Sequence, residues 1–266
     1  MNEDPIKHCK LCNQPKKLCV SHIIPRSFLK SLKKGSSQLI RIDTRPDVAN
    51  RMDNANWSEH LLCKDCEAFL ENRYEGPQLR KLRDYKNNLK SQSRVTLIRF
   101  EYQKFYLFWL SIIWRASLSE SVEFSSVNLD HKIEEVCRGL IFGEFSKDDI
   151  DTFARFLRIG ILRISEEHLN FDTRGFMTSF KVSRQDHVTR YYLVLEGFMV
   201  VYQISKIPDL NLPNEFSTIK NTSHFRIGRV SPHQSEILAS HFSLIFNKGM
   251  QDSAFLDAMH KRGLSN

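Results

Sequence analysis

Six cysteines are the residues of this 266-residue chain whose spacing points most directly to chemistry. Four of them form two Cys-x-x-Cys pairs, Cys9 with Cys12 and Cys63 with Cys66. A two-residue spacer lets both thiolates of a turn face one ion, and two such turns complete the tetrahedral coordination that Zn²⁺ prefers. The redox alternative is weaker, because one redox pair needs no second pair and no βαβ pattern surrounds either pair. The spacing therefore predicts a structural zinc site.

A histidine lies between the two cysteine pairs in a short β-branched segment. Residues 21–25 read SHIIP, which predicts a strand that carries the imidazole of His22 and stops at the proline. A lone histidine near a strand is usually a polar residue with ordinary hydrogen-bond partners. This one suggests a functional role only because it lies between the two cysteine pairs. Residues 62–67, LCKDCE, contain the second cysteine pair and lead into a helix expected over residues 67–74. The Gly76-Pro77 dipeptide should end that helix.

This order of elements resembles the HNH, or ββα-metal, nuclease family over about residues 8–75. The family places a Cys-x-x-Cys pair before a strand that ends in His-Ile-x-Pro, and a second strand before Leu-Cys-x-x-Cys and a helix. The resemblance implies an α+β fold with a zinc-stabilised ββα-metal module at the N-terminal end. It also implies an endonuclease that hydrolyses phosphodiester bonds in DNA, in phage defence or as a toxin-like effector.

The resemblance assigns chemical roles to residues beside the cysteines. His22 matches the general base that deprotonates the attacking water, and the unperturbed imidazole pKa of ~6.5 suits that task. Glu67, directly after the last cysteine, matches a ligand of the catalytic divalent ion, Mg²⁺ or Mn²⁺. Ser21 matches the family's other ligand position, where its hydroxyl is a poor ligand for a hard cation.

The asparagine that orients the base in this family has no clean match in the chain. Asn56 is the candidate for the role, and Asn54, Ser58 and His60 are the alternatives. A polar surface loop explains residues 51–56 equally well, so both interpretations stay open at this point.

Positive charge is concentrated near the N-terminus. Residues 1–100 carry a formal balance of +9, and the rest of the chain carries −1. Such a split predicts that the N-terminal part meets a polyanion, with DNA as the expected partner. The candidate phosphate contacts are Arg26, Lys30, Lys33, Lys34, Arg41, Arg45, Arg80, Lys81, Arg83, Lys86 and Lys90. A solvated surface explains these charges nearly as well.

The patterns divide the chain into a nuclease-like module, residues 1–92, and a mixed helical and β-hairpin domain, residues 93–266. In the second part they predict an apolar helix over 102–118, helices over 129–140, 147–158, 232–246 and 252–261, strands over 93–100 and 176–182, and a hairpin that turns at residues 196–197. No second catalytic constellation occurs there. Its expected role is to pack on the module and to select a substrate or dock a protein partner.

The composition is that of a folded protein that buries a core, with 41% hydrophobic and 26% charged residues. No segment reaches the ~18–20 apolar residues that span a bilayer, and the first residues do not read as a secretory signal. We therefore expect a cytoplasmic location without membrane contact. Two alternatives to the nuclease remain, a zinc-scaffold protein that binds nucleic acid without cutting it and a partner-docking protein.

Overall fold

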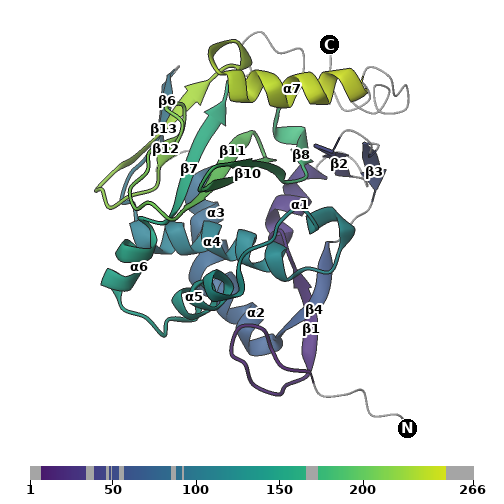
Figure 1. The fold of residues 1–266 in the computed structure, drawn as a ribbon, viewed down its shortest axis with the longest axis vertical. Coiled ribbons are helices and arrows are strands. Elements are labelled where there is room, and N and C mark those ends of the chain that lie inside the picture. Colours follow the sequence, from purple (N-terminus) through teal and green to yellow (C-terminus); the bar gives the residue numbers. More distant parts are fainter. Residues whose placement is uncertain are drawn as a thin grey trace.

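The computed structural model describes residues 7–33, 39–45, 48, 50–53, 57–84, 88–91, 93–165 and 173–249. Its fold is of the α+β class, as predicted from the sequence (Figure 1). The helices are α1 (Arg26–Leu32), α2 (Lys64–Leu70), α3 (Gly76–Arg83), α4 (Tyr102–Leu118), α5 (His131–Phe142), α6 (Lys147–Phe153) and α7 (Glu236–Gly249), with a π-helical turn η1 (Glu71–Glu75) between α2 and α3. No helix in this part of the chain is long and apolar enough to cross a membrane.

The strands form two sheets. In the small sheet, β1 (Leu18–His22) pairs antiparallel with β4 (Ser58–Cys63). The large sheet has the order β3 (Arg51–Asp53), β2 (Leu39–Ile42), β8 (Phe176–Thr178), β10 (Val188–Leu195), β11 (Phe198–Ser205), β7 (Leu157–Ile164), β13 (Phe225–Val230), β6 (Arg94–Leu97) and β5 (Asn88–Lys90). Two more strands join it, β9 (Lys181–Gln185) beside β10 and β12 (Ser217–Thr218) beside β7.

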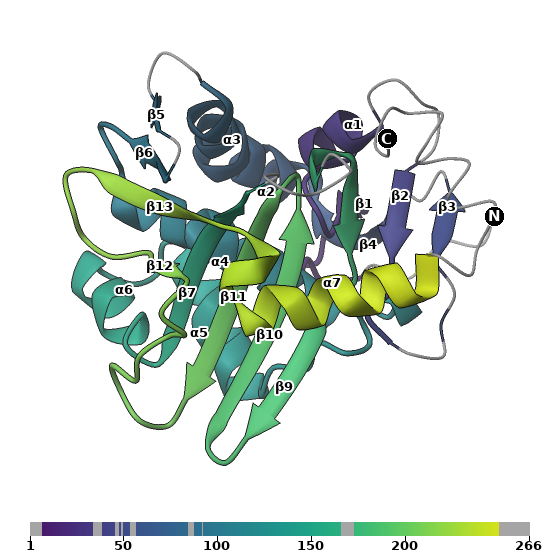
Figure 2. The same cartoon turned by 90° about the horizontal axis from the view of Figure 1, so that it is seen from above.

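Helices cover both faces of the large sheet, with α7 on one face and α4 on the other (Figure 2). Because successive side chains of a strand point to opposite faces, β11 divides its residues between two cores. Phe198, Val200 and Tyr202 belong to the core that contains α4. Met199 and Val201 belong to the smaller core that α7 covers. The centre of the large sheet is thus buried on both sides.

The long apolar helix predicted over residues 102–118 is confirmed as α4. Its side chains are buried almost all round the helix, and Trp109 and Trp114 are at most 1% exposed. A helix that is apolar all round requires packing partners on every side. Here one continuous core joins α4 to the large sheet and to N-terminal residues such as Ile23 and Leu62. Helix α4 therefore supports the segment that carries the two cysteine pairs.

The expectation that Gly76-Pro77 ends the helix after the second cysteine pair is wrong. The chain continues from α2 through η1 into α3 without a break, and Pro77 occupies the first turn of α3. The π-helical turn changes the hydrogen-bond spacing directly before the proline. A proline is tolerated at such a start, because the N–H it lacks needs no helical partner there. Glu67 and the basic residues of α3 therefore lie on one continuous helical rod.

The second half of the chain confirms some expectations and corrects others. The predicted hairpin is β10–β11, and Glu196 and Gly197 at its turn have φ of +51° and +74°, the left-handed conformations of a tight two-residue turn. The predicted helix over 147–158 ends at Phe153, and the chain then forms β7 in the sheet centre. A strand that is buried on both faces lacks the alternation of polar and apolar residues, so periodicity alone does not identify it.

Several other elements have different bounds from those expected. The predicted strand over 176–182 is divided into β8 and β9, and the predicted strand over 93–100 is reduced to β6. The helix expected over 232–246 starts with a 3₁₀ turn and continues as α7. The helix expected over 252–261 lies outside the described residues.

Candidate metal centre and active site

The four cysteines of the two pairs come together in space, although 50 residues separate the pairs in the sequence. The sulfur atoms of Cys9, Cys12, Cys63 and Cys66 all lie within 4.8 Å of one another. Cys12 is half-buried and the other three are buried. Four thiols at this separation form a site that could bind a metal such as zinc.

Local structure explains why the thiols converge. Cys9 and Cys12 flank a tight turn, closed by a hydrogen bond from the Asn13 N–H to the Cys9 carbonyl (2.9 Å), with Asn13 in the left-handed conformation. Cys63 is the last residue of β4, and Cys66 lies in the first turn of α2. The two parts are connected by the Lys10 N–H, which donates to the Leu61 carbonyl (3.0 Å).

The environment of the thiols favours one thiolate before any metal binds. Burial raises the pKa of Cys9, but backbone N–H groups of Cys12, Cys63 and Leu11 outweigh it and lower the pKa to about 7. The Cys63 N–H lies 3.3 Å from the Cys9 sulfur. Burial raises the pKa of Cys12 and of Cys66. Metal binding must therefore displace protons from these thiols, as thiolate coordination generally does.

His22 ends β1 at the opposite end of the strand from the cysteine cluster, as predicted for a strand that carries an imidazole. The residue is half-buried and stands opposite Ser58 in the strand register. Its backbone carbonyl accepts a hydrogen bond of 2.6 Å from Nη1 of Arg115. His22 is therefore fixed by its backbone while part of the residue remains exposed.

Glu67 lies on α2, close enough to His22 for their charges to interact. Burial raises the pKa of its carboxyl group, while a hydrogen bond from Ser21 and the charges of Arg115 and His22 oppose that shift. Oε1 of Glu67 is buried and has no hydrogen-bond partner among the described residues. A buried carboxylate oxygen in that state gains stability from a cation, and carboxylates are ligands of hard divalent ions.

Ser21 has a structural role in the strand pair. Its hydroxyl is buried and accepts the Leu62 N–H at 3.0 Å, beside a β-bulge that shifts the register between Cys19 and Val20. Bulges of this kind redirect neighbouring side chains. The hydroxyl also contacts the carboxyl group of Glu67. Ser21 thus supports both the second strand and the carboxylate.

The middle position of the motif is only partly defined. Asn56 and the alternative Asn54 lie outside the described residues. Of the other two alternatives, Ser58 stands directly opposite His22, whereas His60 is exposed and stands opposite Val20. The strand register therefore places Ser58, and not His60, beside the candidate base.

Sequence reasoning missed a buried ion pair next to the candidate site. Arg115 of α4 is 1% exposed, and its Nη2 lies 2.6 Å from Oε1 of Glu75 in η1. The same guanidinium donates to the carbonyls of His22 and Ser111. It therefore joins α4, η1 and the end of β1. The available signals were an arginine inside an apolar helix and glutamates four residues apart at positions 67, 71 and 75.

This ion pair predicts a large stability effect. Glu75→Ala should lower the free energy of unfolding by about 3–5 kcal/mol, because it leaves the buried charge of Arg115 without its partner. Urea denaturation followed by circular dichroism measures the change. Glu120→Ala is the control, because Glu120 is an exposed glutamate and a change within about 0.5 kcal/mol is expected. Equal effects of the two substitutions would contradict a structural role for the pair.

Comparison with protein-family models, with curated proteins and with solved structures gives no match to this chain.

Proposed function

We propose that the chain is a metal-dependent, HNH-like endonuclease that hydrolyses phosphodiester bonds in DNA, in phage defence or as a toxin-like effector. The observation that carries the proposal is the order of β1, β4 and α2 around the four-cysteine cluster, with His22 and Glu67 close to each other. In this arrangement a candidate base and a candidate metal-binding carboxylate lie within range of each other's charge. These are the two groups that metal-assisted phosphodiester hydrolysis requires.

The roles follow from the chemistry of the side chains. His22 accepts a proton from a water molecule, and the resulting hydroxide attacks the phosphorus atom. The P–O bond to the leaving sugar oxygen breaks, and that oxygen takes up a proton from solvent water. Glu67 would hold a Mg²⁺ or Mn²⁺ ion together with water molecules and phosphate oxygens, and the bound ion supplies charge neutralisation at the phosphate. Arg115 fixes the backbone of His22 and contributes positive charge near Glu67. The base and the carboxylate are thereby held before the substrate arrives.

Zinc in the cysteine cluster has a structural role in this proposal. It would connect the turn at Cys9–Cys12 to the junction of β4 and α2, which carries Glu67. A site with four thiolate ligands is closed and leaves no position for substrate. The zinc therefore positions the reacting groups and does not take part in hydrolysis.

One observation favours a second candidate function, a zinc-scaffold protein that binds nucleic acid or a protein partner without cleavage. Ser21 occupies the position where the HNH pattern expects a metal-binding side chain. Its hydroxyl instead accepts a hydrogen bond from the Leu62 N–H. Plasmid nicking with Mg²⁺ or Mn²⁺ separates the two functions. Nicking by the purified wild-type chain supports the nuclease, and its absence with both ions, in protein that retains its zinc and still binds DNA, supports the scaffold.

The role of Glu67 gives a prediction of its own. Glu67→Ala should lower the cleavage rate about 10- to 100-fold, the range seen when metal-site support is lost, and excess Mg²⁺ or Mn²⁺ should restore part of the rate. Initial rates measured across a metal titration test this. Asp65→Ala is the matched control, because Asp65 is exposed in the same helical turn and forms only a surface ion pair with Lys16. A loss that no metal concentration relieves would contradict the assigned role.

A further inference from the structure

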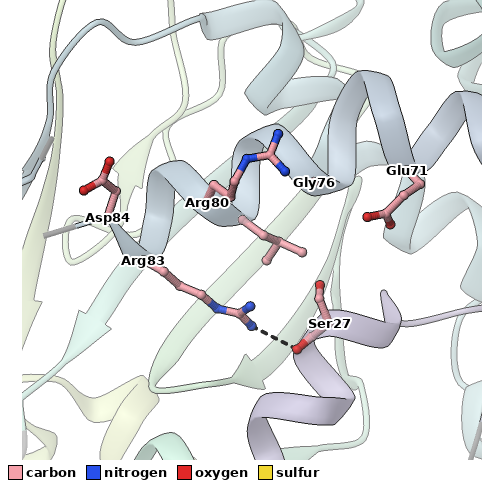
Figure 3. Close-up of a pocket in the computed structure, with 7 residues that line it drawn as sticks. Ser27, Glu71, Gly76, Arg80, Arg83 and Asp84 are labelled. Carbon is pink, nitrogen blue, oxygen red and sulfur yellow. Dashed lines mark hydrogen bonds between the residues drawn. The ribbon is translucent and has the colours of Figure 1, made fainter. Parts of the chain in front are cut away.

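A cavity of about 460 Å³ lies between α1 and α3 (Figure 3). Its walls come from the two helices and from η1, and they consist of Ser27, Glu71, Gly76, Leu79, Arg80, Arg83 and Asp84. The volume falls within the range of small-molecule sites. Two of the lining residues follow the candidate site residues closely in the sequence: Glu71 lies one turn after Glu67, and Ser27 lies five residues after His22.

Arg83 is held in place at one wall of this cavity. Its Nη2 donates to the Ser27 carbonyl (3.1 Å) and to a carboxylate oxygen of Glu196 (2.9 Å), and its guanidinium lies 5.6 Å from the ring centre of Phe28. The side chain is nevertheless 38% exposed. An arginine that is already ordered loses little conformational entropy when it binds a ligand, so Arg83 is preorganised, and a bound anion would share its guanidinium with Glu196.

Arg80 contributes a second guanidinium to the same cavity. It is exposed, and Figure 3 shows it beside Gly76 on the α3 rod. A Cβ atom on Gly76 would approach Nη1 of Arg80 to 3.2 Å, so the absence of a side chain lets this arginine lie against the helix backbone. The charge of Arg80 also acts on the carboxyl group of Glu71 across this glycine.

The lining combines two arginines with two carboxylates, and the helices on either side of the cavity add further cations. Helix α1 carries Arg26 and Lys30, helix α3 carries Arg80, Lys81 and Arg83, and neither helix contains an acidic residue. Such a concentration of cations binds phosphates without reading sequence. The carboxylates of Glu71 and Asp84 also line the cavity and add hydrogen-bond acceptors. The lining therefore suits a ligand with phosphate oxygens on one side and hydroxyl or amino donors on the other, which is the chemistry of a nucleotide.

We propose that this cavity binds one nucleotide of the nucleic-acid strand next to the cleaved bond, with its phosphate held by Arg80 and Arg83. The inference rests on the proposed nuclease function and adds a second contact region outside the His22–Glu67 pair. Binding here would fix the strand relative to the base. The same chemistry would also accept a free nucleotide, so the test must separate the two sources.

The test measures binding of full-length protein to a short duplex oligonucleotide by fluorescence anisotropy at several salt concentrations, without added Mg²⁺ or Mn²⁺. Arg80→Gln and Arg83→Gln should each weaken binding about tenfold, the value of one charge-assisted hydrogen bond, and lower the salt slope by about one. Arg184→Gln is the matched control, because Arg184 is an exposed arginine on β9, on the opposite side of the molecule from α1 and α3 in Figure 2. Thermal unfolding confirms that each variant is folded.

The outcomes separate this inference from the proposed function. A wild-type chain that binds and cleaves DNA, with both cavity variants binding as tightly as Arg184→Gln, would overturn the cavity and leave the nuclease intact. A wild-type chain that neither binds nor cleaves DNA would overturn both. A nucleoside monophosphate should compete for the Arg80-dependent part of binding, and the nucleoside without phosphate should not. A chain that binds the monophosphate through Arg80 and Arg83 but binds duplex independently of both arginines would make the ligand a free nucleotide and overturn the strand-binding role.

Discussion

Replacing His22 by alanine should lower the rate of DNA cleavage by about 10²–10⁴-fold, the contribution of a positioned general base. The affinity for DNA, the zinc content and the unfolding temperature should stay close to those of the wild type. The base acts on the attacking water and adds little to ground-state binding. Single-turnover cleavage with saturating Mg²⁺ measures the rate of the chemical step, and anisotropy without added divalent ions measures binding separately.

The structure supports this separation of chemistry from stability. The contact with Arg115 uses the backbone carbonyl of His22, which alanine retains. His60→Ala is the matched control, because His60 is an exposed histidine on the paired strand. It should cleave at the wild-type rate. Equal cleavage by wild type, His60→Ala and His22→Ala would remove His22 as the general base of the proposed mechanism.

Local sequence patterns predicted the parts of this site that lie close together in the chain. The spacing of Cys9 with Cys12 and of Cys63 with Cys66 predicted one cluster, because each spacer fixes two thiols on one turn. The β-branched run that ends at Pro25 predicted the strand of His22. The apolar helix α4 and the Glu196-Gly197 turn were also predicted correctly, since each depends on neighbours within a few residues.

The parts that sequence reasoning missed depend on contacts between distant residues. Arg115 reaches the carbonyl of His22 across 93 positions of the chain, and no local pattern encodes that pairing. The fold of the stretch between the cysteine pairs also depends on a distant contact. Its strand β2 pairs in parallel with β8, where Ile40 stands beside Phe176. In β7 the side chains are buried on both faces, which removes the alternation that identifies a strand.

The continuous rod from α2 to α3 is a further case, and it has consequences for the site. Local rules treat Gly76-Pro77 as a break, yet the π-helical turn before it carries the helix onward. As a result the rod starts beside the cysteine cluster, passes Glu67 and ends with Arg80 and Arg83. One rigid element therefore spans the proposed metal, hydrolytic and phosphate-binding groups. Anything that displaces its first turn would disturb all three.

Loss of the metal cluster should therefore have the largest structural effect. We expect about one Zn²⁺ per wild-type chain, held by the four cysteines, and none in Cys63→Ser. Binding at structural zinc sites contributes folding free energy, with apparent values of about 10–16 kcal/mol in zinc-finger peptides. Even about 4 kcal/mol of that lost would lower the unfolding temperature of a chain this size by about 8–16 °C. Metal analysis and differential scanning calorimetry on the same preparation measure both quantities.

The matched control for this substitution lies next to the cluster. Cys19 is half-buried outside the set of four, and its sulfur donates to the Leu62 carbonyl in a weak hydrogen bond of 3.3 Å, which a serine hydroxyl can replace. Cys19→Ser should keep the zinc and the unfolding temperature of the wild type. Without the metal, the turn that carries Cys9 would be joined to the start of the α2 rod by packing and by hydrogen bonds such as those from the N–H groups of Lys10 and Cys63. A Cys63→Ser chain that retains full zinc and unfolds at the wild-type temperature would show that the cluster is not the metal site, and the assigned position of Glu67 would lose its support.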